Sequence, residues 1–231
     1  MRWQEKQAKI EADVYEAINE LEDEIGVVAP YYPTVFWVGK TIEFEDTGLA
    51  ERKQARFFKK VLARESCLMW PRIILIFKND PEAIKEEAAH FIHLSVSGLK
   101  LSGHSIQETI CARAIAEMLG IFGAKMLGSH RKNNFEIVPD LSRLNADDWQ
   151  VICDALPDYF QTNSDFYEFY ACQQGYGLGE RIFYQYVLGN ISQKFIKGLF
   201  LDPLIGPKAA SQKFIRLKKR FWPESKSQAT K

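Results

Sequence analysis

The residues with the clearest chemical potential lie in one short segment, from Lys85 to His93. It contains two adjacent carboxylates, Glu86 and Glu87, and two histidines, His90 and His93. In a helix, Glu86, His90 and His93 share one face at spacings of four and three residues, with Glu87 beside them. A pair of ligands one turn apart can hold a metal ion, and an adjacent glutamate can act as a general base. The segment therefore predicts a metal site, or what remains of one.

The elements that must position this segment follow from the surrounding sequence. Asp80 can cap a helix and Pro81 suits its first turn, and Ser97 and Gly98 end the helix that they begin. A second long helix is predicted from residue 105 to about residue 127. The other predicted elements are strands at residues 34–39 and 71–77 and helices at residues 10–25, 49–64, 146–156, 165–173, 177–188 and 192–201.

Composition excludes several classes of function. The chain has 231 residues, with 30 basic and 30 acidic side chains, so its net charge gives no reason to expect nucleic acid as a partner. The four cysteines are far apart and form neither a zinc knuckle nor a redox pair. No apolar run reaches the roughly 18 residues of a membrane span, and residues 1–6 lack an apolar signal region. We expect a soluble, cytoplasmic protein without a transmembrane segment.

The segment Glu86-Glu87-Ala88-Ala89-His90 resembles the His-Glu-x-x-His motif of the zincin metallopeptidases, with the first histidine replaced. A later segment, residues 113–120, resembles the second motif of the gluzincin branch, Glu-x-x-x-Asp/Glu-x-x-Gly. Glu117 and Gly120 match that motif, whereas Arg113 stands where it has the third zinc ligand. Both departures remove a zinc ligand.

The resemblance implies a fold as well as a site. It covers roughly residues 10–128 and implies an α+β fold, in which a small zincin-like sheet packs on the motif helices and a helical subdomain follows. The implied organisation is a zincin-like core over residues 1–128, a helical subdomain over residues 129–222, and a frayed polar tail over residues 223–231.

The resemblance also implies a role for each matching residue. Glu87 would be a vestigial general base, and His90 and Glu117 would remain at the former metal site. Glu86 and Arg113 would face each other there, so that an ion pair replaces the metal and no cofactor is expected. We hypothesise a pseudoenzyme, leaning away from activity, that binds a peptide or protein partner in the inherited cleft.

Other interpretations stay open. A working metal-dependent peptidase, a hydrolase, would hold zinc or another divalent metal through a carboxylate-rich set, which suits manganese or iron better than zinc. Its ligands would be Glu86, His90, Glu108 and Glu117. Alternatively, Glu86 and Arg113 are solvated residues and the motif is a coincidence in a plain helical interaction domain. We interpret His93 as a structural residue.

Two later segments carry weaker signals. Residues 173–181 contain three glycines in five positions around Tyr176, and resemble a glycine-rich helix start found in several peptidase families. Tyr176 could steady an oxyanion, but helix packing through the glycines is the interpretation we favour. The basic segment from Lys208 to Arg220 predicts an amphipathic helix, for which a solvated surface is favoured over membrane or nucleic-acid binding.

Overall fold

The structure is a computed structural model that describes residues 3–37, 66–69, 72–77, 79–99, 106–130, 163–202 and 207–222. The predicted helices at residues 49–64 and 146–156 and the tail from residue 223 lie outside the described residues. The chain divides into two compact units. The first comprises residues 1–96 and 123–131, and the second comprises residues 97–122 and 132–231.

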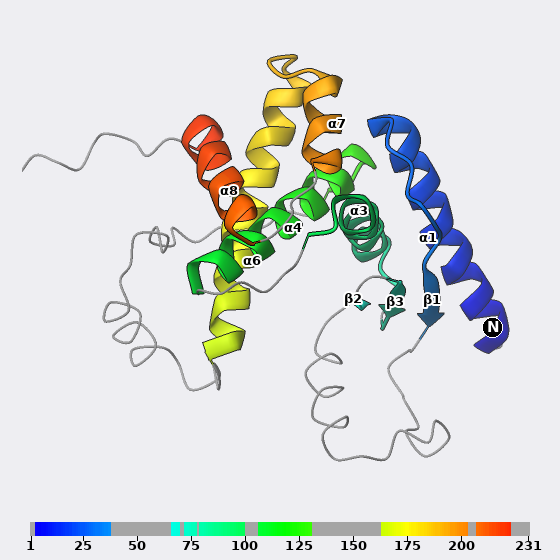
Figure 1. The fold of residues 1–231 in the computed structure, drawn as a ribbon. Helices are drawn as coiled ribbons and strands as arrows, with labels where there is room; N and C mark the ends of the chain where they lie inside the picture. The colour runs from blue at the N-terminus through cyan, green and yellow to red at the C-terminus, as the bar shows by residue number, and fades with distance from the viewer. Residues whose placement is uncertain are drawn as a thin grey trace, which may run out of the picture. The chain divides into compact units, whose positions relative to one another are not determined.

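The first unit begins with α1 (Trp3–Ile25), which runs along strand β1 (Thr34–Trp37) (Figure 1). Apolar residues at three- and four-residue steps give α1 its buried stripe, as the periodicity predicts. This stripe is fully buried and consists of Ile10, Val14, Ile18, Leu21 and Ile25. The helix ends where Gly26 adopts a φ of 65°, a left-handed conformation that suits glycine.

Three short strands form the sheet of the first unit. Strand β3 (Ile73–Ile76) is central, parallel to β1 and antiparallel to β2 (Ser66–Met69). The edge of β1 is covered by the amide of Gln7 in α1, which donates to Val35 O at 2.7 Å and accepts from Trp37 N at 2.6 Å. These bonds satisfy backbone groups that an edge strand leaves open, so α1 is fixed in register on the sheet.

Helix α3 (Pro81–Ser97) follows the sheet, and α4 (Ile106–Met126) comes next. The bounds of both agree with the helices predicted from the caps and from the apolar spacing. Gly98, with a φ of 63°, ends α3 as expected. The last turn of α4, from Gly123, belongs to the first unit, and the preceding residues of α4 belong to the second.

The second unit combines those residues of α4 with α6 (Asn163–Val187), α7 (Gln193–Leu201) and α8 (Pro207–Phe221). Phe122 is fully buried in an aromatic cluster, with ring centroids 6.0 to 6.4 Å from its neighbours Phe183, Tyr186 and Phe200. Ser192 caps α7 by accepting a hydrogen bond from Phe195 N at 3.2 Å. None of the helices in the described ranges is long and apolar enough to cross a membrane.

The expected α+β fold of the zincin type is wrong. The chain is mostly helical, because helices contain 75% of the described residues, whereas the sheet has three strands of only four residues each. Because each strand has only four residues, the helices supply most of the buried side chains. Strands do lie within the predicted ranges, at Thr34–Trp37 and Ile73–Ile76, but they contribute too little to define the fold class.

A second difference concerns the glycine-rich segment. Two helices were predicted at residues 165–173 and 177–188, with a helix start between them, but α6 runs unbroken through both. Isolated glycines weaken a helix by about 1 kcal/mol each and do not necessarily end it. Here the glycines lie in close helix contacts, described below, which favour the continuous helix.

Candidate functional site

Helix α3 carries three of the predicted site residues, Glu86, Glu87 and His90, and its start is well defined. Asp80 Oδ1 accepts a hydrogen bond from Glu82 N at 3.0 Å, and Asp80 O accepts the first helical bond from Ile84 N at 3.1 Å. Asp80 is therefore the N-cap that the sequence predicts, with Pro81 directly after it.

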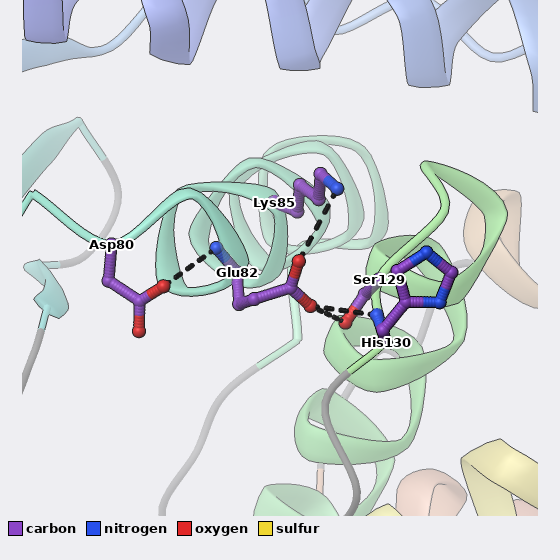
Figure 2. Close-up of polar contacts among 5 residues, drawn as sticks. All are labelled: Asp80, Glu82, Lys85, Ser129 and His130. Atoms are coloured by element: carbon purple, nitrogen blue, oxygen red, sulfur yellow. Dashed lines mark hydrogen bonds and ion pairs between the residues drawn. The ribbon is translucent and has the colours of Figure 1, made fainter.

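The side chain of Glu82 fastens this start to the turn that follows α4 (Figure 2). Its Oε2 accepts a short hydrogen bond from the Ser129 hydroxyl and a second one, at 3.0 Å, from His130 N. Its Oε1 lies 3.5 Å from Lys85 Nζ. These contacts join the beginning of α3 to the end of α4, so the direction of α3 is set by side-chain bonds as well as by packing.

A close contact fixes the middle of α3. A Cβ added to Gly123 in α4 would lie 2.4 Å from Ala89 Cβ and 2.9 Å from Leu21 Cδ2. Glycine and alanine at these positions let α1, α3 and the last turn of α4 approach one another. Ala89 immediately precedes His90, so this contact also fixes the position of His90 relative to α1 and the last turn of α4.

The predicted face of α3 is buried. Glu86, Glu87 and His90 are 7%, 8% and 9% exposed, and His93 is completely enclosed. The structural role of His93 stays a prediction. Four ionisable side chains within two turns are unusual in a protein interior, because a buried charge is costly unless it is compensated.

Glu86 and His90 form the closest pair on this face. Glu86 Oε1 lies 3.8 Å from His90 Nε2. This separation exceeds a hydrogen bond, but it agrees with two ligands of one metal ion. Donors that each lie about 2.1 Å from a metal can be at most about 4.2 Å apart. The same distance also suits an ion pair when the imidazole is protonated.

The other predicted residues lie in the second unit. Glu108, Arg113 and Glu117 are partly buried residues of α4, and Tyr176 is a partly buried residue of α6. Arg113 and Glu117 share one face of α4, at a spacing of one turn. The contact of Glu86 with Arg113, and the metal set that adds Glu108 and Glu117, stay predictions.

The glycines around Tyr176 bring α6 against α4 and α8. A Cβ added to Gly175 would lie 2.5 Å from Ala114 O and 2.6 Å from Glu117 Cβ, and one added to Gly179 would lie 2.5 Å from Met118 O. A Cβ on Gly177 would lie 2.7 Å from the Trp222 ring. Packing is thus one role of this segment, and Gly175 leaves room for the side chain of Glu117.

Two polar arrangements were not predicted from the sequence. The first is the bonding of Glu82 to the turn after α4. The second is Lys213 in α8, whose buried Nζ donates to Leu199 O at 3.1 Å and lies 3.1 Å from Asp202 Oδ2. Lys213 belongs to a basic stretch, and its position four residues before Leu217, on the apolar stripe of the helix, was the available signal of its burial.

No known protein family, curated protein or solved structure matches this chain. The site is therefore interpreted from its own residues.

Proposed function

We propose that this protein is metallopeptidase-like, with a degenerate zinc site, that it has no peptidase activity, and that it acts by binding a peptide or protein partner. The supporting observation is the buried pair of Glu86 and His90 on α3. Glu86 occupies the position of the first histidine in His-Glu-x-x-His, and the next residue, Glu87, matches the general base of that motif.

The two buried carboxylates on this face of α3 require a compensating positive charge. Glu86 and Glu87 are adjacent carboxylates that are both less than a tenth exposed. Two buried carboxylates require protons or nearby positive charge, and a zincin meets this need with its metal. We propose that Arg113 supplies this charge here, because its planar guanidinium is cationic and can donate to two carboxylate oxygens.

Restoring the ligands tests the inherited site. The double variant Glu86→His/Arg113→Glu recreates both zincin motifs. It should bind zinc stoichiometrically after saturation and desalting, measured by elemental analysis, whereas the wild-type chain should retain none. The matched control is Lys85→His/Arg113→Glu, which places the new histidine one residue off the face of His90 and should not retain zinc.

Three results are informative. Zinc retained by the double variant and not by the control supports descent from a zinc site. Failure of the folded double variant to bind zinc would overturn the proposed descent from a zinc site. A stoichiometric divalent metal in the wild-type chain would overturn the metal-free proposal and favour the second candidate below.

The partner class needs its own test. A random peptide library displayed on phage is selected against the wild-type chain and against a folded His90→Ala variant. The expected result is a family of peptides that binds the wild-type chain and loses affinity for the variant. Peptides that bind both proteins equally would show that the α3 face does not hold the partner.

The second candidate is an active metal-dependent peptidase with carboxylate-rich ligation. One observation favours it: the 3.8 Å between Glu86 Oε1 and His90 Nε2 is compatible with a shared metal ion. Glu87 would then activate water, as a general base beside the metal. Chelator-sensitive cleavage of unfolded casein, abolished by Glu87→Gln, would establish it.

A further inference from the structure

Charge is segregated along this neutral chain. Helix α1 contains eight acidic and two basic side chains, whereas α7 and α8 together contain eight basic side chains and no acidic one. The whole chain is neutral, and its acidic and basic surfaces are opposite in sign. Such a distribution directs association more strongly than net charge does.

The acidic surface has a regular spacing. Glu16, Glu20 and Glu24 are exposed on one stripe of α1, at steps of four residues and thus about 6 Å along the axis. Several other acids of this helix are engaged within the unit, for example Asp13, which pairs with Lys9 at 2.6 Å. Glu16 and Glu20 have no ion-pair partner among the described residues.

The basic surface repeats this four-residue step at Arg216 and Arg220, and the uncharged Gln212 lies between Lys208 and Arg216. Lys208, Arg216 and Arg220 are exposed along one stripe of α8, at multiples of four residues, with Lys219 beside them. Arg220 is held in place, because its guanidinium lies 4.8 Å from the ring of Phe195 and 4.8 Å from that of Phe221. In the described part of the chain, Arg216 and Lys219 have no acidic partner.

The packing of α8 argues against membrane insertion. Its apolar stripe, formed by Ala210, Phe214 and Leu217, is buried within the second unit. A membrane-binding amphipathic helix needs this stripe for the acyl region. The only acid that follows α7 closely, Asp202, already pairs with the buried Lys213. The outward face of α8 therefore contains basic and uncharged side chains and no acidic one.

We propose that the basic stripe of α8 binds the acidic stripe of α1 in a second copy of this chain. Matching periods of about 6 Å let successive pairs form along two packed helices. Each copy carries both surfaces, so the contact joins two different surfaces, one from each copy. Exposed ion pairs are individually weak, so the association is weak and strongly salt-dependent.

A charge swap tests this contact. Sedimentation velocity at about 20 mM salt should show wild-type association that increases with protein concentration and disappears near 0.5 M salt, where charges are screened over a few ångströms. Arg216→Glu/Lys219→Glu and Glu16→Lys/Glu20→Lys should each remain monomeric. Mixing these two variants, or combining all four substitutions in one chain, should restore association.

The matched control changes charge elsewhere in the same unit. Lys194→Glu/Lys197→Glu reverses two exposed lysines of α7, outside the α8 stripe, and should reduce association much less than Arg216→Glu/Lys219→Glu. Circular dichroism establishes that each variant is folded. A wild-type chain that is monomeric at low salt would overturn the proposal, as would failure of the swapped pair to associate. Salt-sensitive binding of a single-stranded oligonucleotide by wild-type monomers would assign the stripe to nucleic acid instead.

Discussion

The contact between α6 and α4 allows a quantitative test of how the second unit is packed. A Cβ added to Gly179 would lie 2.5 Å from Met118 O and 3.3 Å from the Met118 carbonyl carbon. Both are backbone atoms, so no rotamer change can relieve the overlap. Ordinary contact begins near 3.4 Å, so Gly179→Ala should separate the two helices locally by about 1 Å.

The magnitude follows from two opposing effects. Overpacking of this kind costs about 1–3 kcal/mol, and the higher helix propensity of alanine returns up to about 1 kcal/mol. We expect a net loss of about 1–2 kcal/mol. For a chain of this length, this loss lowers Tm by roughly 2–8 °C.

The chain provides a matched control for this substitution. Gly198 is an exposed helical glycine of α7, and a Cβ added there meets nothing within 4 Å. Gly198→Ala should therefore raise stability by about 0.5–1 kcal/mol. Urea unfolding followed by far-UV circular dichroism measures both variants. The packing argument is refuted if Gly179→Ala is as stable as Gly198→Ala.

Two further outcomes follow from the polar contacts. Burial lowers the pKa of Lys213 from its ordinary value of 10.5, with Asp202 acting in the opposite direction. Between the lowered pKa and 10.5 the unfolded chain binds more protons, so stability rises with pH there, and Lys213→Met should remove this rise in urea midpoints measured from neutral pH upward. Glu82→Ala and Ser129→Ala should each cost about 1–2 kcal/mol, and the double variant should cost clearly less than their sum; strict additivity would show that the bond between them contributes nothing.

Local signals predicted most of the helices. The helix predicted at residues 10–25 ends at the expected residue in α1 but begins earlier, at Trp3. In α3 the apolar spacing and the caps agree, and the structure confirms Asp80 as N-cap and Gly98 as terminator. Short-range rules succeed there because the capping bonds and the buried stripe depend on residues within a few positions of one another. The same reasoning predicted α7 and α8 to within one residue.

Signals that depend on distant partners were missed. Strand β2 has only four residues, and it is stabilised by its antiparallel pairing with β3 rather than by a pattern of its own. The continuity of α6 depends on the α4 backbone, which Gly175 and Gly179 contact directly. Their spacing supported the predicted helix packing, but two separate helices, at residues 165–173 and 177–188, were still expected where α6 is continuous.

In the candidate site, too, the features set by nearby residues were predicted and those set by distant partners were not. The shared face of Glu86, His90 and His93 follows from the helical repeat alone, and the structure adds that this face is buried. Sequence spacing does not show which cation compensates the two carboxylates, because that partner belongs to another element. The identity of this cation is what separates the two proposed functions.

Burial makes stability a reporter of that cation. A face this enclosed leaves little room for the water shell of a hydrated ion, so a metal bound there must take most of its ligands from the protein. Metal binding would then be coupled to folding, and removal of the ion from a metal-dependent chain would lower Tm strongly. In a chain that uses a guanidinium instead, the compensating positive charge is covalently attached, so chelators leave the Tm unchanged. In that chain, loss of Arg113 destabilises the fold even when no metal is present, because two buried carboxylates are left without their positive charge.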